Sequence, residues 1–347
     1  MRISPRLQEM LRTAREQHAC VWPHDDAEAQ RLRRAFRAGI VVSPARGIFF
    51  GRSQWEELAF RDRILLTMCG LQALHPSWVF AGPSAAAAHG LWVSNRDLLP
   101  IRVAAHRKAH GRPHGIIFPQ SVGSAEVVEV DGIRCTTLLR TVHDCLREMD
   151  FAHGLAIADS TLRTGGMSRE ALVERLTHLD GSRRGAVHAL ETAEHADARA
   201  QSGGESICRA RLIVLGYQLP ELQVELPNVV DGGVYYGDFG WIREGRCWLV
   251  GELDGHEKYL NPEMTKGKSS FEVLSAERLR ESRITALRIP VVRFSFSDVM
   301  NDERFTTILD AYGVPRTTEA QYRGAGKPFA PAGVAEARER AANLWPR

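Results

Sequence analysis

The chain has no apolar run that approaches the roughly 18 residues of a membrane-spanning helix, so we expect no segment that crosses a bilayer. Its opening residues, Met1 to Arg6, lack the apolar core of a signal peptide. The sequence also lacks the phosphate loop of P-loop ATPases and the G-x-S-x-G elbow of serine hydrolases. The lack of a long apolar run and of a signal peptide predicts a cytoplasmic protein with no membrane partner.

Cysteine and lysine are both scarce. The 6 cysteines are scattered and form no C-x-x-C pair, so we expect buried free thiols. Lysine occurs at only five positions, and the other 40 of the 45 basic residues are arginine. Three of the five lysines, Lys258, Lys266 and Lys268, lie close together, which makes that segment a candidate for chemistry.

Length and composition indicate an ordinary globular protein of several parts. At about 100–200 residues per domain, 347 residues predict two or three domains. The hydrophobic share of 44% and the charged share of 25% exclude a wholly disordered chain, a collagen-like repeat and a coiled-coil rod. The net charge of +3 divides into +4 for residues 1–201, −4 for 202–314 and +3 for 315–347. This mild basic excess at the front is weak support for a nucleic-acid partner.

The first 55 residues have the order of a small winged helix. Helical spacing covers residues 5–17 and 27–38, the second helix begins after Asp25-Asp26, and residues 40–51 are typical of two strands around a turn. In such a module the second helix enters the major groove and the hairpin reaches phosphate. We therefore predict DNA contacts by five arginines, with a merely solvated helix face as the alternative: Arg31, Arg33, Arg34, Arg37 and Arg46.

We divide the rest of the chain into three parts. Residues 56–201 predict a middle α/β domain. We expect a long helix over 54–74, then strands over 99–104, 115–118 and 126–130, and then four helices after residue 137. Gln201-Ser-Gly-Gly204 is the expected boundary. Residues 202–314 follow an α-β-β-β-α-β order that predicts a mixed sheet flanked by helices. Residues 315–347 are expected to be a loosely held, flexible tail. The predicted fold class is thus α/β in the broad sense, for a chain of several domains that are α+β in arrangement.

Acidic residues cluster within the third part. Asp238 lies on one predicted strand and Glu252 ends the next, so a hairpin brings both carboxylates to one end. Period two puts Asp254 on the same face as Glu252, and Glu205 arrives from the preceding helix. Such acids repel one another, and Mg²⁺ or Mn²⁺ resolves the repulsion while activating water for attack on a phosphodiester. Lys258 is a candidate cation near the phosphate.

These residues also match a known pattern. The matching pieces are Gly204-Glu-Ser-x-x-Arg209, Asp238-Phe239, Gly251-Glu-Leu-Asp-Gly255 with Lys258-Tyr259, Glu277-x-x-Arg280-Glu281, Val291-Val-Arg293 and Asp298. With them, segment 203–299 resembles the PD-(D/E)XK nuclease superfamily, and within it the domains similar to very-short-patch repair endonucleases. The resemblance implies a restriction-endonuclease-like fold that cleaves DNA with Mg²⁺ or Mn²⁺ in defence or repair.

The resemblance also implies roles for particular residues. Asp238 and Glu252 would be the metal ligands, with Glu205 as the acid of the first helix, and Arg280 and Arg293 would support the site or touch DNA. Where the superfamily has its lysine, two residues after the second acid, this chain has Asp254. That exchange is frequent in relatives with a Glu-x-Asp-Gly motif, and it leaves the catalytic lysine unassigned, with Lys258 as our candidate.

The front of the chain resembles a second family. The winged-helix-like start, Ser84-Ala-Ala with His89-Gly-Leu91, and Thr136-Thr-Leu-Leu-Arg-Thr-Val-His-Asp144 are similar to AbiEi-type antitoxins of type IV toxin–antitoxin systems. In that family the first domain binds operator DNA and the next neutralises a nucleotidyltransferase toxin. Two hypotheses follow: a Mg²⁺-dependent DNA endonuclease, or an antitoxin-like transcriptional regulator, typically a dimer, whose nuclease fold is inactive.

Overall fold

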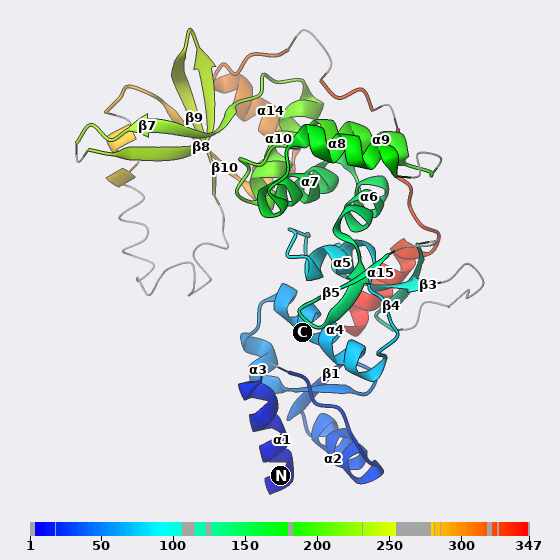
Figure 1. Cartoon of the computed structure of the whole chain (residues 1–347). Coiled ribbons are helices and arrows are strands. Elements are labelled where there is room, and N and C mark those ends of the chain that lie inside the picture. The colour runs from blue at the N-terminus through cyan, green and yellow to red at the C-terminus, as the bar shows by residue number, and fades with distance from the viewer. Residues whose placement is uncertain are drawn as a thin grey trace. The chain divides into compact units, whose positions relative to one another are not determined.

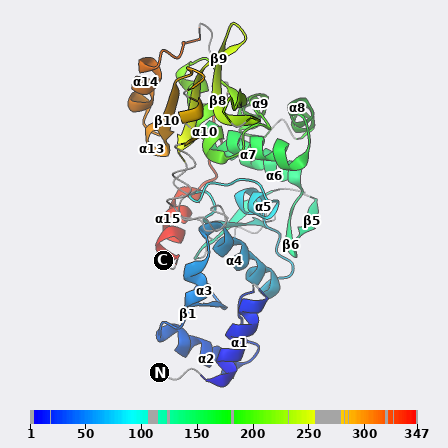
Figure 2. The same ribbon diagram turned by 90° about the vertical axis from the view of Figure 1, so that its left-hand side faces the viewer.

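The computed structural model describes residues 4–17, 19–105, 115–122, 126–179, 183–230, 232–254, 279–280, 282–284, 286–317, 321–324 and 326–345. The chain is a mixed α/β protein that forms two compact units (Figures 1 and 2). Unit 1 comprises Met1–Glu148, His178–Arg184 and Phe329–Arg347, and unit 2 comprises Met149–Thr177 and Gly185–Pro328. No described helix is long and apolar enough to cross a membrane.

Unit 1 begins with two helices and a hairpin, as the sequence predicts. These are α1 (Pro5–Glu16), α2 (Asp26–Arg37), β1 (Val41–Ala45) and β2 (Ile48–Gly51). Asp25 begins α2 by accepting a hydrogen bond from the Glu28 N–H, which satisfies one of the free donors at a helix start. Leu7, Leu32 and Phe49 share one buried cluster, so the helices and the hairpin form a single small core.

The middle of unit 1 packs short helices around two small sheets. Its elements are α3 (Arg52–Glu57), α4 (Phe60–Leu74), α5 (Gly82–Ala88), β3 (Ile101–Ala105), β4 (Ile117–Ser121), β5 (Val127–Val130), β6 (Ile133–Thr136) and α6 (Leu138–Glu148). Strands β3 and β4 are parallel, whereas β5 and β6 form an antiparallel hairpin. The single helix expected over 54–74 is wrong, because Leu58 and Ala59 have extended backbone that separates α3 from α4.

The C-terminal part of the chain returns to unit 1. Where we expected a loosely held tail, residues Val334–Leu344 form helix α15, with Val334 and Ala337 buried against Phe118 of β4. Beyond the helix, the Trp345 ring lies 5.3 Å from that of Trp55, measured between centroids. The alternation of small apolar and charged residues therefore encodes an amphipathic helix that completes the core of unit 1.

Unit 2 starts with a group of helices around a buried ion pair. They are α7 (Phe151–Gly165), α8 (Arg169–His178), α9 (Ala186–Glu194) and α10 (Gly203–Leu215). Asp159 on α7 and Arg209 on α10 are both buried, and the guanidinium donates to both carboxylate oxygens at 2.7 and 2.8 Å. This buried pair, in which Nη2 of Arg209 donates to both oxygens, fixes α10, which carries Glu205, against α7.

The rest of unit 2 is built on one four-stranded sheet of order β10-β9-β8-β7. Its strands are β7 (Glu221–Pro227), β8 (Val234–Arg243), β9 (Arg246–Asp254) and β10 (Val291–Ser295), followed by α13 (Phe296–Val299) and α14 (Asp302–Ala311). Strands β7, β8 and β9 are antiparallel neighbours, and β10 runs parallel to β9. The mixed sheet that the sequence predicts is therefore present.

Two close approaches between elements depend on glycine. A Cβ at Gly204 would lie 2.8 Å from Leu253 Cδ2, so glycine lets the start of α10 approach β9. A Cβ at Gly251 would lie 2.9 Å from the Trp241 ring and 3.2 Å from the Phe294 ring. Glycine at these two positions thus brings the start of α10 and the packed rings of the sheet close to the end of β9 that carries Glu252.

Candidate functional site

Strands β8 and β9 separate at the predicted acids. Their pairing ends at Phe239↔Gly251, one residue before Asp238 on β8 and Glu252 on β9. Among the described strands, β8 is paired only with β7 between Asp238 and Val234, and the last residues of β9 are paired only with β10. The Leu253 N–H, which has no β8 carbonyl opposite it, donates to Asp238 Oδ2 at 3.0 Å. The structure therefore places both acids at an opening in the sheet.

Glu252 is almost completely buried, and two arginines hold its carboxylate. Its side chain is 6% exposed, Oε1 accepts a hydrogen bond from Arg280, and Oε2 lies 3.1 Å from Arg293 Nη2. Arg293 is the direct register partner of Glu252 across β9 and β10. Because an isolated buried carboxylate is costly, the two guanidinium groups stabilise the charged form of Glu252.

Asp254 shares one of these arginines. It follows Glu252 by two residues and lies on the same face of β9, where Arg293 Nη1 donates to Asp254 Oδ1 at 3.2 Å. Arg293 therefore bridges Glu252 and Asp254. The sequence predicted that these acids share a face, and the structure adds that an arginine of the neighbouring strand links them.

Glu205 lies in the first turn of α10, and nearly all of its hydrogen-bonding capacity is used. The Gln201 N–H and Gln223 Nε2 donate to its Oε2, and the Ser202 hydroxyl donates to its Oε1 at 2.9 Å. Burial, and after it the nearby charge of Asp238, raises the pKa of Glu205, although the hydrogen bonds act against this shift. Glu205 thus ties the first turn of α10 to Gln201 and Gln223, and it is also a neighbour of the opening.

The described residues contain no group of three or more His, Cys, Asp or Glu side chains that could hold a metal ion. Mg²⁺, however, keeps several waters and often takes only one or two protein carboxylates. Asp238 and Glu252 supply hard oxygen donors at adjoining positions of β8 and β9, so they are the candidate ligands for such a metal. Arg280 and Arg293 already hold Glu252, and they would compete with the metal for it.

Sequence reasoning identified the acids but missed how they are held. Gln223, whose φ of 53° is unusual for a residue other than glycine, turns its amide toward Glu205. Arg280 and Arg293 were expected near the site, but pairing with Glu252 was not foreseen. Lys258, the predicted cation, lies outside the described residues, as do Lys266 and Lys268.

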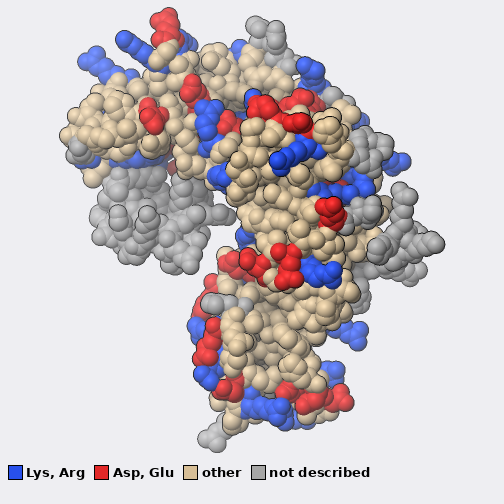
Figure 3. Space-filling model, in the orientation of Figure 1, with Lys and Arg blue, Asp and Glu red and all other residues tan. Residues whose placement is uncertain are grey.

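The predicted DNA-contacting arginines of unit 1 fall into two groups. Arg33, Arg34, Arg37 and Arg46 are exposed, and within the described chain none of these four side chains has an ion pair or hydrogen bond. Arg31 is only half-buried, and its Nη1 is enclosed without a hydrogen-bond partner among the described residues. Figure 3 shows basic and acidic side chains interspersed over this end of unit 1; on α1 they pair with one another, whereas Arg33, Arg34 and Arg37 of α2 form no such pair among the described residues.

The pairing of arginines on α1 explains this contrast. Arg12 pairs with Glu9 and Glu16, Arg15 with Glu57, and Arg6 reaches Glu28 on α2. The positive charge of α1 is therefore neutralised within the unit, whereas the charge of α2 and the β1–β2 hairpin remains available to an anionic partner.

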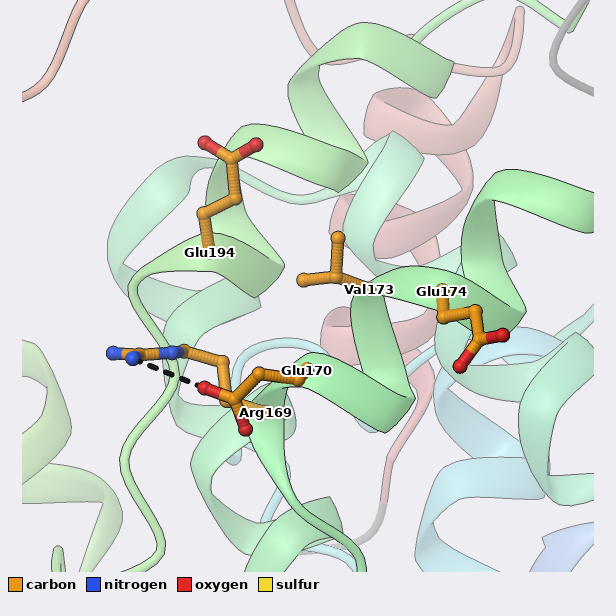
Figure 4. Close-up of a pocket in the computed structure, with 5 residues that line it drawn as sticks. All are labelled: Arg169, Glu170, Val173, Glu174 and Glu194. Atoms are coloured by element: carbon orange, nitrogen blue, oxygen red, sulfur yellow. Dashed lines mark hydrogen bonds and ion pairs between the residues drawn. The ribbon is translucent and has the colours of Figure 1, made fainter.

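A shallow pocket elsewhere in unit 2 has a different character. It measures about 560 Å³ and is lined by Arg169, Glu170, Val173, Glu174 and Glu194, from α8 and the end of α9 (Figure 4). Arg169 pairs with Glu170 at 3.2 Å, and both side chains are exposed. None of the predicted site residues lines this pocket, and its exposed acids form no metal-binding group within the described chain.

Comparison with known proteins identifies relatives but no characterised function. Uncharacterized protein Rv2248 of Mycobacterium tuberculosis strain H37Rv is 33% identical over 196 residues, which are 55% of this chain and 68% of the relative. Uncharacterized protein MT2308 of strain CDC 1551 matches to the same extent. The chain therefore belongs to the family of these two mycobacterial proteins. No family model matches the sequence, and no solved structure matches it significantly.

Proposed function

We propose that this chain is a DNA-binding protein whose unit 2 sheet hydrolyses DNA phosphodiesters with Mg²⁺, in defence or repair. One observation carries the proposal: β8 and β9 separate where Asp238 and Glu252 lie, so carboxylates of two neighbouring strands share one opening. Carboxylates at neighbouring positions of two strands are an arrangement that suits a divalent cation.

The order of elements supports the same proposal. Helix α10, the antiparallel strands β7, β8 and β9, and the parallel strand β10 match the described part of the α-β-β-β-α-β order expected of a PD-(D/E)XK-like, restriction-endonuclease-like fold. The helix expected over 268–282 lies mostly outside the described residues. A winged-helix-like reading of α1, α2 and the β1–β2 hairpin gives the protein a second, separate DNA-binding element.

In the proposed reaction, each residue at the opening has a separate role. Asp238 and Glu252 would hold Mg²⁺, which would supply a Lewis acid for the phosphate and lower the pKa of its bound water. Glu205 orients Gln223 and adds negative charge beside Asp238. Arg280 and Arg293 bring positive charge to a domain whose acids would otherwise repel DNA. Asp254 holds Arg293 in place.

A cleavage assay on the full chain tests the proposal. Supercoiled, linear and single-stranded DNA are incubated with Mg²⁺ and wild-type protein, Asp238→Asn or Glu252→Gln. We expect cleavage by the wild type and none by either variant, with unchanged circular dichroism. The matched control is Glu225→Gln, because Glu225 is an exposed carboxylate on β7, away from the opening. Cleavage that survives in both variants would refute the site.

A second function is favoured by the pairing of Glu252 with Arg280 and Arg293, which neutralises this acid without a metal. In that case the chain is an antitoxin-like transcriptional regulator with an inactive nuclease fold and a nucleotidyltransferase toxin as partner. Wild-type protein that binds duplex DNA but cleaves none of the substrates supports this function. Loss of binding in Arg33→Gln/Arg34→Gln would then assign the binding to α2.

A further inference from the structure

Helix α2 presents one polar face on which the arginines Arg33 and Arg37, the acid Asp26 at the helix start and a single uncharged hydrogen-bonding side chain, Gln30, lie together. Glu28, Leu32 and Ala35 are buried on the opposite side of the helix. Gln30, Arg33 and Arg37 follow one another at helical spacing, so they lie on one face, and all three are exposed. Within the described chain, the Gln30 amide has no hydrogen-bond partner.

Arginine and glutamine side chains make different kinds of contact with DNA. The phosphate backbone is polyanionic, so a guanidinium contributes binding energy there whatever the DNA sequence. An uncharged amide contributes little to binding at the phosphates. A glutamine amide, which donates and accepts side by side, matches the N6 donor and N7 acceptor of adenine in the major groove. Gln30 also lies in the N-terminal half of α2, the half of a recognition helix that meets base edges.

We propose that Gln30 is the base-reading residue of this protein and that it selects adenine in the major groove. Arg33, Arg34 and Arg37, with Arg46 on the hairpin, hold the phosphates on either side and fix the register of α2. The inference rests on the proposed binding of DNA by this module, and it is independent of the acids in unit 2. It adds to that binding the residue that determines specificity.

The test is a selection of full-length protein on a library of random duplex DNA, followed by sequencing of the bound fraction. Wild-type protein should enrich a motif with an invariant adenine at one position, and Gln30→Ala should lose the preference at that position alone. The matched variant Arg34→Gln should keep the motif and bind all sequences more weakly, with a salt slope smaller by about one. Gln30 is exposed, so Gln30→Ala leaves the fold of the module intact.

A chemical substitution in the DNA then checks the contact itself. Replacing the selected adenine by 7-deazaadenine removes the N7 acceptor and should weaken wild-type binding about tenfold while leaving Gln30→Ala unaffected. An unchanged motif in Gln30→Ala, or equal loss in both proteins, would overturn the inference while DNA binding stands. Absence of any DNA binding by the wild type would overturn the proposed function of α2 and this inference with it.

Discussion

Arg293 on β10 lies directly opposite Glu252 on β9, and the two side chains pair at 3.1 Å in the interior of unit 2. Arg280 holds the other oxygen of the same carboxylate, across 28 residues of sequence. The acid that the proposed chemistry requires is thus occupied by two cations of the protein itself. Any metal at this opening must displace at least one of them.

This competition predicts that Arg280→Gln binds Mg²⁺ more tightly than the wild type. Removing one guanidinium frees Oε1 of Glu252, and we expect the dissociation constant to fall about fivefold, a gain typical of losing one partly exposed ion pair. Isothermal titration calorimetry of the full chain without DNA measures it. The control is Arg304→Gln, which breaks the pair with Asp298 away from Glu252. Equal affinities in all three proteins would contradict the competition.

The buried pair of Asp159 and Arg209 predicts a large stability effect. In Asp159→Asn the Arg209 charge stays buried without its counter-ion, which costs about 3–5 kcal/mol of unfolding free energy. Urea denaturation followed by circular dichroism measures the loss. Arg199→Gln, which removes the exposed partner of Asp197, should cost less than about 1 kcal/mol. If both variants lost a similar amount of unfolding free energy, burial of the ion pair would not be what determines its contribution to stability.

The C-terminal helix predicts a role for Trp345 in unit 1. Its ring is buried against Trp55 and Phe60, so Trp345→Ala should lower the free energy of unfolding by about 3 kcal/mol. Thermal and urea denaturation check this value. Leu344→Ala, at an exposed neighbouring position, should have little effect. If Trp345→Ala left the stability unchanged, the loosely held tail expected from the sequence would be the better description.

His143 predicts how the stability of unit 1 depends on pH. Burial lowers its pKa to about 4, while Asp144 acts in the opposite direction. The unfolded chain takes up this proton near pH 6.5, before the folded chain does, so stability present above pH 6.5 is lost between pH 6.5 and 4. At pH 5 the loss amounts to about 2 kcal/mol.

The His143→Gln variant isolates this contribution. Its unfolding free energy should fall less between pH 7 and pH 5 than that of the wild type, by about the same 2 kcal/mol. Urea titrations at the two pH values give the comparison. His178→Gln, which changes an exposed histidine, should behave as the wild type does. A His143→Gln protein with the wild-type pH dependence would assign the acid sensitivity to other groups.

Local patterns in the sequence predict much of the fold. The helix start at Asp25-Asp26 and the strands that carry Asp238 and Glu252 are confirmed, because each depends on neighbours within a few residues. The break at Leu58 could not be predicted, since no proline or glycine marks the point where the backbone becomes extended. Similarly, the return of α15 to unit 1 depends on contacts with residues as distant as Trp55.

The candidate site was predictable to the same degree. The motif around Glu252 and the period-two placement of Asp254 follow from short stretches of sequence. The opening between β8 and β9 depends on where pairing stops, and the arginines that hold Glu252 depend on the register of β10. Both depend on how strands pair in three dimensions, and β10 is separated from β9 by a long stretch of sequence.

The most direct test of the account is a Mg²⁺ titration by calorimetry of the wild type and of the double variant Asp238→Asn/Glu252→Gln. We expect saturable binding to the wild type and none to the double variant, with both proteins folded by circular dichroism. Equal binding by the two proteins, or no binding by the folded wild type in the presence and absence of duplex DNA, would contradict a metal site at the opening of the sheet.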